Sequence, residues 1–355
     1  MIDSPLARTL LYLPAKLYEL GVRARVAAYH HQLFKTFRLK APVISVGNLT
    51  VGGTGKTPCV AFIATTLRDA GHQPAILSRG YKRQTKGRVE VSNGTDILCS
   101  AAESGDEPFL LARNCPGVRV LVDRDRVAAG QWLESRAPVS AFVLDDAYQH
   151  LRLARDLNLL LIDATEPLNK AAMIPFGRLR EPLAEIRRAD VIIITRSDRL
   201  AGLAAKTELL EMLNRLSRPK TPIFFAWHQM TQLRNLLSQT KVPLADFSGK
   251  SVAAVSGIAR PERFIDDLNQ AGMRIVLRRD FADHHRYSES EVAAILADAQ
   301  SARAEAIIVT EKDAANLPLE MIRNTSLPIF AAQIEFDCED KAALRNLLLA
   351  AAQKT

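Results

Sequence analysis

A glycine-rich stretch at residues 47–57 constrains the fold of this chain more than any other feature. The apolar, β-branched residues 43–46 before it favour a buried strand, and Thr57-Pro58 after it favours a helix start. Glycines at positions 52, 53 and 55 allow a tight turn whose backbone N–H groups form a cradle for phosphate. The order of strand, loop and helix predicts a P-loop, with Lys56 on the β- and γ-phosphates and the Thr57 hydroxyl on magnesium.

The loop departs from the P-loop pattern G-x-x-x-x-G-K-[ST] at one position, where Thr50 replaces the first glycine. The competing interpretation is a chance Gly-Lys-Thr in a glycine-rich turn, and the order of the flanking elements argues against it. The predicted nucleotide-binding residues are Thr50, Val51, Gly52, Gly53, Thr54, Gly55, Lys56 and Thr57.

A second motif, at residues 140–146, is an apolar strand that ends in Asp145 and Asp146. Downstream of a P-loop this is the Walker B arrangement, whose carboxylate holds magnesium directly or through water. The alternative is a strand that ends in a capped turn. Because the P-loop precedes it, we expect a site for a nucleoside triphosphate and magnesium.

Apolar strands alternate with helical patterns along the chain, which predicts an α/β fold with a doubly wound, mostly parallel sheet. A length of 355 residues suggests two domains. We expect a P-loop core at 41–240 and a smaller α/β lobe at 241–355, because periodicity weakens near 218–250. Further strands are expected at 73–79, 118–122, 157–163, 190–195, 251–258, 273–277, 306–310 and 328–332, a hairpin within 82–100, and helices at 59–70, 109–114, 125–135, 203–216, 261–271, 289–300 and 341–351.

Residues 1–40 carry seven basic and two acidic side chains, a large part of the net charge of +8. Their apolar residues recur at helical spacing, which predicts an amphipathic helix that is broken or bent near Pro14 and Gly21. Such a helix can lie in an anionic membrane surface or dock on the protein's own core, and the pattern alone does not decide. No apolar run is long enough to span a membrane, and we expect no signal peptide. Four scattered cysteines without a C-x-x-C pair fit a reducing compartment.

Three polar segments have no certain role from their residues alone. Asp106 lies where a helix is expected to start, so its carboxylate could merely complement the helix dipole. His284 and His285 beside Asp283 could be ligands or a base, although such pairs usually lie in solvated loops. Thr195-Arg196-Ser197-Asp198 loosely matches the N/T-K-x-D signature that reads guanine, with arginine in place of lysine.

Several motifs together resemble the tetraacyldisaccharide 4′-kinase family of the lipid A pathway, and they occur in the family's order. They are Gly47-Asn48-Leu49-Thr50-Val51-Gly52-Gly53-Thr54-Gly55-Lys56-Thr57-Pro58, Leu77-Ser78-Arg79-Gly80-Tyr81, Ser104-Gly105-Asp106-Glu107-Pro108, Leu144-Asp145-Asp146-Ala147-Tyr148-Gln149-His150, Leu179-Arg180-Glu181-Pro182 and Phe281-Ala282-Asp283-His284-His285. The family P-loop also lacks the first glycine. One departure is Ala147, where the family has glycine, so the geometry of that turn is in question.

The resemblance implies ATP-dependent phosphorylation of the 4′-hydroxyl of a tetraacylated glucosamine disaccharide 1-phosphate, which gives lipid IVA. It implies that Asp106 is the base and His284 its partner, with His285 as the alternative, and that Lys56 contacts the transferring phosphate. It also implies that Asp145, Asp146 and Glu181 serve Mg2+ with Thr57, and that the substrate contacts Arg79, Tyr81, Gln149 and Arg180. The lipid acceptor favours peripheral attachment of residues 1–40 to the cytoplasmic face of the inner membrane.

Two other classes of function are compatible with a P-loop. Thr195-Arg196-Ser197-Asp198 motivates a P-loop GTPase or a nucleotide-dependent metallochaperone, which competition between ATP and GTP would distinguish. The basic composition motivates a nucleic-acid-binding ATPase. Much of the excess positive charge lies in residues 1–40, and no basic groove with aromatic residues follows, so we expect no nucleic-acid partner.

Overall fold

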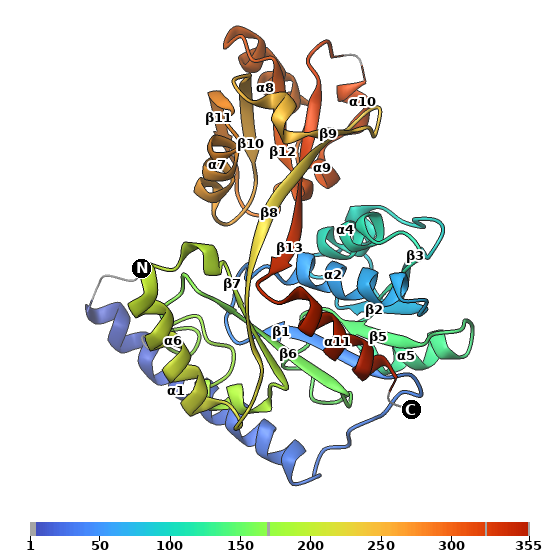
Figure 1. Ribbon diagram of the computed structural model, residues 1–355, viewed down its shortest axis with the longest axis vertical. Coiled ribbons are helices and arrows are strands. Elements are labelled where there is room, and N and C mark those ends of the chain that lie inside the picture. Colours follow the sequence, from blue (N-terminus) through green and yellow to red (C-terminus); the bar gives the residue numbers. More distant parts are fainter. Residues whose placement is uncertain (1–4, 169–170, 324, 354–355) are drawn as a thin grey trace.

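The computed structural model describes residues 5–168, 171–323 and 325–353, which form two lobes joined by two long strands (Figure 1). Within these residues one thirteen-stranded sheet has the order β11-β10-β12-β13-β8-β7-β6-β1-β5-β2-β4-β3, with β9 paired to β8. The β13–β8, β3–β4 and β8–β9 pairs are antiparallel, whereas the other neighbouring strands of the sheet are parallel. The predicted α/β fold with a mostly parallel sheet is therefore confirmed.

The larger lobe surrounds a core of buried parallel strands. Its strands are β1 (Val43–Asn48), β2 (Pro74–Ser78), β3 (Val89–Asn93), β4 (Arg119–Val122), β5 (Ala141–Leu144), β6 (Leu157–Asp163) and β7 (Val191–Thr195). Its helices are α1 (Pro5–His30), α2 (Lys56–Asp69), α3 (Ala101–Ser104), α4 (Asp106–Asn114), α5 (Arg126–Glu134) and α6 (Gly202–Leu216), with the 3₁₀ turns η2 (Leu183–Arg188) and η3 (Ser197–Arg199). Side chains of α2, α4 and α11 pack on one face of this sheet, and those of α1, α5 and α6 pack on the other. Burial on both faces explains why these strands are continuous apolar runs.

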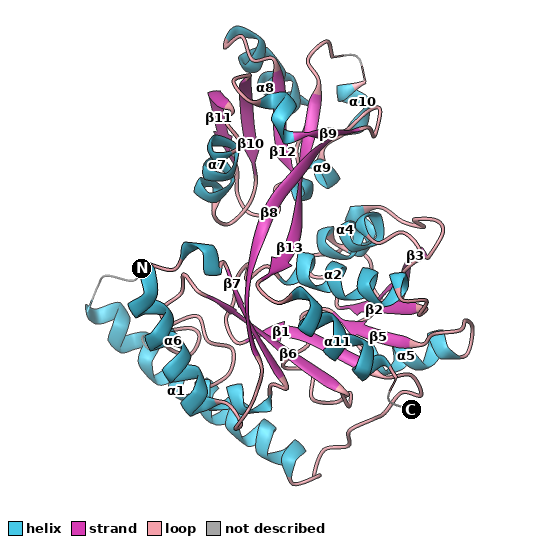
Figure 2. Cartoon of the chain, viewed as in Figure 1, coloured by secondary structure: helices cyan, strands magenta, loops and turns pink. Residues whose placement is uncertain are grey.

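The smaller lobe continues the same sheet. Its strands are β9 (Lys241–Pro243), β10 (Ser251–Ser256), β11 (Arg274–Asp280) and β12 (Ala306–Thr310), and its helices are η4 (Leu244–Phe247), α7 (Pro261–Gln270), α8 (Glu289–Ser301), α9 (Glu311–Asn316) and α10 (Leu319–Ile322). Strands β8 (Ile223–Asn235) and β13 (Ile329–Cys338) run between the lobes as an antiparallel pair (Figure 2). Helix α11 (Lys341–Ala352) then returns to the larger lobe, where Leu344 and Leu348 join the same buried cluster as Val60 of α2.

Several expected boundaries were wrong. Strand β8 lies in the region where we expected only weak periodicity. Its periodicity is weak because the strand passes through two different environments, so the pattern of buried and exposed residues changes along its length. The hairpin expected to turn at Asn93-Gly94 is present only as a short turn: Ser92 and Ile97 form an antiparallel bridge and Leu98 N donates to the Val91 carbonyl at 2.8 Å, whereas the strand partner of β3 is β4. Helix α4 begins at Asp106 and not at Phe109. The expected domain boundary near residue 240 remains a prediction, and the return of α11 means that no single cut in the chain separates the two lobes.

Helix α1 is continuous through Pro14 and Gly21, so the predicted break is absent, and it ends at His30 instead of continuing toward residue 40. Ala15 is buried against the larger lobe, whereas Leu13, Leu17 and Leu20 on the same helix are exposed, Leu13 by 65%. The helix therefore both docks on the core and presents apolar side chains outward. Residues 1–4 of the predicted segment lie outside the described residues. None of the helices in the described ranges is long and apolar enough to cross a membrane.

Candidate active site

The predicted P-loop lies between β1 and α2, at the carboxyl end of the parallel strands. Gly55 caps α2 with a left-handed conformation (φ 79°), so Lys56 and Thr57 occupy the first helical turn. The free N–H groups of that turn and the helix dipole favour an anion at this position. The ammonium group of Lys56 lies 3.2 Å from Asn48 Oδ1 and 3.4 Å from Asp146 Oδ1, which holds it beside the loop.

Four carbonyl groups of the P-loop are bound by side chains from other segments. The pairs are Arg178 Nη2 with Val51 O (2.6 Å), Arg196 Nη2 with Gly53 O (2.7 Å), Thr195 Oγ1 with Thr54 O (3.0 Å) and His228 Nε2 with Gly55 O (3.2 Å). In a trans peptide the following N–H points away from the carbonyl. The amide hydrogens of this loop are therefore turned away from these four side chains, as a phosphate cradle requires.

Glycine is required at two positions of the loop. Gly52 has φ 115° and a Cβ there would overlap the Arg178 guanidinium group, whereas a Cβ at Gly55 would overlap the His228 ring. Both side chains could lie this close only because the loop carries no side chain at these positions. Burial lowers the pKa of His228 to about 4, so the ring is neutral when it contacts the Gly55 carbonyl.

The two aspartates after β5 have opposite electrostatic environments. Asp146 binds Arg180 Nη1 and Nη2 at 2.9 and 2.8 Å. Burial alone would raise its pKa, but Lys56 and Arg180 hold the pKa of Asp146 far below its ordinary value. Burial and the charges of Glu107 and Asp146 raise the pKa of Asp145 to about 7. The residue with the left-handed conformation in this turn is Asp146 (φ 48°) and not Ala147. Alanine in place of glycine at position 147 therefore causes no backbone strain.

Asp145 provides a direct test of the magnesium expectation. Its Oδ2 accepts a hydrogen bond from Ser78 Oγ at 2.9 Å, whereas its Oδ1 is buried and has no hydrogen-bond partner. A buried carboxylate oxygen without a donor fits a cation ligand. Within the described ranges no three His, Cys, Asp or Glu side chains are grouped to hold a metal. Magnesium does not need such a group, because it commonly uses one or two carboxylates with water and phosphate oxygens.

Glu181 and Gln149 belong to a neighbouring polar network. The buried carboxylate of Glu181 is paired with the Arg188 guanidinium group and accepts a hydrogen bond from Gln149 Nε2 at 3.2 Å. The same amide group of Gln149 donates to the Asn48 carbonyl at 2.9 Å. The role of Glu181 as a magnesium ligand stays a prediction.

The two lobes bring Asp106 and His284 together. His284 Nδ1 lies 2.7 Å from Asp106 Oδ2, although the residues are far apart in the sequence. Burial alone would raise the pKa of Asp106, but hydrogen bonds from His284 and Asn316 and the charge of Lys312 hold it below its ordinary value. The carboxylate is therefore ionised near neutral pH, and the His284 ring must carry its proton on Nδ1 to donate to it. His285 instead contacts Glu291 Oε1 at 3.1 Å.

The remaining predicted substrate residues lie at different depths. Arg79 and Tyr81 are exposed, and the Tyr81 ring centroid is 6.0 Å from that of His284. The Arg180 side chain is engaged by Asp146 and Asn48. Sequence reasoning missed Asn48, which accepts from both Lys56 and Arg180, and the buried Arg126, whose pKa is affected by the charges of Asp145 and Asp146. Asn48 ends an apolar strand and could have been noticed as a polar residue in a buried run.

The fold and the site define a P-loop phosphotransferase in which the two lobes bring Asp106 and His284 into contact. A family model described as LpxK, tetraacyldisaccharide-1-P 4′-kinase, matches residues 7–353. The chain belongs to this tetraacyldisaccharide 4′-kinase family, as its sequence motifs indicated.

Relatives and a solved structure agree with this assignment. The chain is 40% identical over 352 residues to a tetraacyldisaccharide 4′-kinase of Syntrophus aciditrophicus, which covers 98% of this chain and 93% of the relative. It is 41% identical over 339 residues to one of Geobacter sulfurreducens, covering 95% and 92%. A crystal structure of LpxK from Aquifex aeolicus in complex with ATP is similar with a TM-score of 0.79 and 31% identity, over 97% of this chain and 99% of that one.

Proposed function

We propose that this protein transfers the γ-phosphate of ATP to the 4′-hydroxyl of a tetraacyldisaccharide 1-phosphate, giving lipid IVA. Membership of the family supports the acceptor, and the similar LpxK structure that contains ATP supports the donor. The observation that carries the proposal is the Asp106–His284 pair at 2.7 Å, because it adds a candidate base to a P-loop site. Glu107, the residue after this base, lies near enough to Asp145 for its charge to act there.

The proposed reaction needs a base and a charge clamp. The oxygen of the 4′-hydroxyl attacks the γ-phosphorus, its proton passes to the Asp106 carboxylate, and the bond to the β–γ bridging oxygen breaks to release ADP. His284 orients that carboxylate by donating from Nδ1. A carboxylate with a low pKa suffices if the proton leaves late, as expected for a loose transition state. Lys56 and the amide hydrogens of the P-loop stabilise charge on the phosphates.

Magnesium is the proposed cofactor. Thr57, Asp145 and Asp146 would hold it, and the unpartnered Oδ1 of Asp145 supports this choice. The bound ion would neutralise charge on the β- and γ-phosphates.

The acceptor is a lipid, and we propose that the protein binds peripherally to the cytoplasmic face of the inner membrane through α1. The exposed Leu13, Leu17 and Leu20 support contact with acyl chains. Two contacts place this helix beside the site loops: Tyr18 Oη donates to the Arg180 carbonyl at 3.1 Å, and Arg25 Nη2 donates to the Gln149 carbonyl at 3.1 Å.

The test is transfer of radiolabelled γ-phosphate from ATP to purified tetraacyldisaccharide 1-phosphate in mixed micelles. We expect a labelled lipid product that depends on added Mg2+ and is absent without acceptor. Unlabelled ATP should compete with the label far better than GTP. Thr195 and Arg196, which loosely match a guanine-reading signature, instead donate hydrogen bonds to P-loop carbonyl groups. Release of inorganic phosphate without labelled lipid, or preference for GTP, would contradict the proposal.

A further inference from the structure

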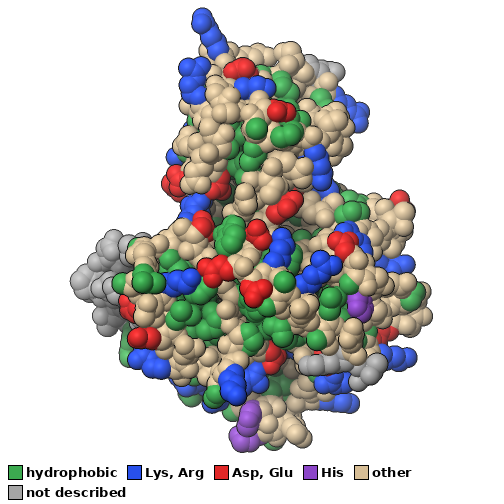
Figure 3. Space-filling view, viewed as in Figure 1, with side chains coloured by type: hydrophobic (Ala, Val, Ile, Leu, Met, Phe, Trp, Pro, Cys, Tyr) green, Lys and Arg blue, Asp and Glu red, His purple; other side chains and the backbone are tan. Residues whose placement is uncertain are grey.

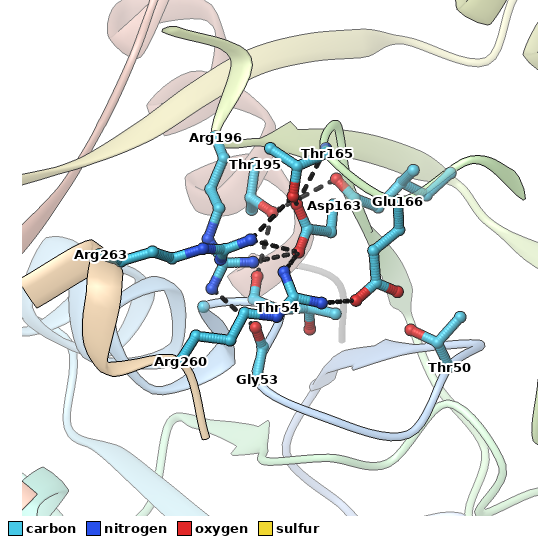
Figure 4. A network of polar contacts seen from close by, with 12 residues as sticks. Thr50, Gly53, Thr54, Asp163, Thr165, Glu166, Thr195, Arg196, Arg260 and Arg263 are labelled. Carbon is cyan, nitrogen blue, oxygen red and sulfur yellow. Dashed lines mark hydrogen bonds and ion pairs between the residues drawn. The ribbon is translucent and has the colours of Figure 1, made fainter. Parts of the chain in front are cut away.

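A cluster of arginines around two carboxylates joins the smaller lobe to the larger one beside the P-loop (Figure 4). Asp163, at the end of β6, is almost fully buried, with its side chain 1% exposed. It is paired with Arg196 of the larger lobe and lies 3.4 Å from Arg260 Nη1 of the smaller lobe. Arg263 of α7 approaches the same carboxylate at 3.8 Å and donates to Thr165 Oγ1 at 2.8 Å.

Arg260 is the member that binds both carboxylates. It precedes α7 and, besides approaching Asp163, its Nη2 is paired with Glu166. Glu166 also pairs with Arg178 Nη1 at 2.8 Å. The space-filling view shows acidic and basic side chains side by side at the waist between the lobes (Figure 3).

Each of these carboxylates is connected, through one arginine, to a carbonyl group of the P-loop. Asp163 pairs with Arg196, which donates to the Gly53 carbonyl, and Glu166 pairs with Arg178, which donates to the Val51 carbonyl. Two chains of contacts therefore run from Arg260 to the carbonyl groups on either side of Gly52. Each ends on a peptide group whose orientation sets the direction of an amide hydrogen.

We propose that Arg260 is a positioning residue that couples the placement of the smaller lobe to the phosphate-binding shape of the P-loop. Through Asp163 and Glu166 it fixes Arg196 and Arg178, and these in turn hold the Gly53 and Val51 carbonyls away from the nucleotide. The inference rests on the proposed function only in taking the P-loop as the ATP site.

The geometry explains why arginine is needed at this position. A guanidinium group presents several donors in a planar fork and can bind two carboxylates at once, whereas a lysine is a single point of charge. The burial of Asp163 also matters. Removing a partner from a buried carboxylate costs far more free energy than breaking an ion pair at the surface. A separate contact, Arg199 Nη2 to Asp267 Oδ1 at 2.8 Å, holds α7 against the larger lobe nearby.

Coupling of this kind must act in both directions. If docking of the smaller lobe through Arg260 favours the phosphate-binding shape of the loop, then nucleotide in the loop favours docking by the same factor.

The experiment measures binding of a non-hydrolysable ATP analogue with Mg2+ to the full-length protein, without lipid, in Arg260→Ala and Arg260→Lys. We expect the alanine variant to bind about 10-fold more weakly, a typical coupling magnitude, and the lysine variant to be intermediate. The KM for ATP should rise by a similar factor in the kinase assay, while kcat at saturating ATP changes less than about threefold. Arg278→Ala is the matched control, because Arg278 pairs with Glu262 and Asp280 inside the smaller lobe, and its affinity should stay at the wild-type value.

A double-mutant cycle separates positioning from a general loss of stability. In a Glu166→Gln background, Arg260→Ala should cost clearly less affinity than in the wild type, because one of the two chains is already broken. Equal losses in both backgrounds, or unchanged affinity in Arg260→Ala with a native circular dichroism spectrum, would overturn the inference. If the alanine variant does not fold, Arg260→Lys with wild-type affinity and KM would overturn it equally. Because lipid is absent, failure of the coupling is distinguishable from failure of lipid phosphorylation, which the wild-type kinase assay reports.

Discussion

Lys56 is held toward the P-loop by Asp146 and Asn48, so its charge lies where the phosphates are expected. We expect Lys56→Ala to reduce phosphate transfer by at least about 10³-fold, because charge stabilisation dominates catalysis in this class. Its circular dichroism spectrum should stay native, since the Asp146 carboxylate keeps its two hydrogen bonds from Arg180 when the lysine is removed. Lys241→Ala, on an exposed strand of the smaller lobe, is the control. Turnover near the wild-type rate in Lys56→Ala would remove this loop from the active site.

The raised pKa of Asp145 predicts that the stability of the protein depends on pH. Because its pKa is raised to about 7 in the folded protein, the folded state retains a proton that the unfolded state has lost above about pH 4. Without divalent cations the free energy of unfolding should therefore fall as pH rises from 5 to 7, by up to about 1.4 kcal/mol per pH unit from this group, and then level off. Asp145→Asn should lack this component.

The measurement is thermal unfolding between pH 5 and 8 in a chelator, repeated with Mg2+. Added Mg2+ should stabilise the wild type more at pH 8 than at pH 5, because the ion competes with the proton for the carboxylate. Parallel pH profiles for wild type and Asp145→Asn would show that this carboxylate does not titrate in the range.

At the scale of the element, α1 is the feature whose role the sequence left open. It docks through Ala15 and still exposes three leucines. We expect the triple substitution of Leu13, Leu17 and Leu20 by Gln to weaken binding to anionic vesicles and to raise the KM for lipid several-fold, with little change in the KM for ATP. Vesicle sedimentation is the measurement, and Leu237→Gln, an exposed leucine of the smaller lobe, is the control. Equal sedimentation of the triple variant and the control would confine α1 to a structural role.

Elements differ in how well their sequence predicted them. Strands such as β1, β6 and β7 are buried on both faces, and their apolar runs located them almost to the residue. Strand β8 escaped prediction because it passes from one lobe to the other, so its pattern of burial changes along its length. Helix α11 has an ordinary amphipathic pattern, and nothing in that pattern tells which lobe it packs on.

The same contrast holds for the site. The P-loop and the aspartates after β5 are local motifs, and a local pattern is enough to find them. The arginine cluster around Asp163 joins a residue of β6 to arginines just after β7 and at the start of α7, which are distant in the sequence and have no fixed spacing. Arg196 was noticed only for its likeness to a guanine-reading signature, and in the structure it binds the P-loop backbone and Asp163.

At the scale of the whole molecule, the candidate base is divided between the lobes: Asp106 begins α4 and His284 follows β11. The lobes also meet through Asn114 Nδ2 and Glu311 Oε1 at 3.0 Å, and through Lys312 and Glu107 at 3.5 Å. Catalysis should therefore depend on how the lobes are placed, which the β8–β13 pair and these contacts determine. If the pair acts as the base, such an arrangement would limit transfer to water, because the base would be complete only when the lobes are together.

The divided base predicts a particular pattern of kinetic losses. Asp106→Asn keeps the shape of the side chain but cannot accept the proton, so kcat should fall by roughly 10²–10⁴-fold. His284→Ala should also lower kcat, and the double variant should lose much less than the product of the two single losses, since the residues act as a unit. His285→Ala is the matched control: its ring contacts Glu291 and not Asp106, so kcat should stay within about threefold of the wild type. Single losses that multiply in the double variant, or a larger loss from His285→Ala than from His284→Ala, would show that the carboxylate works without this imidazole.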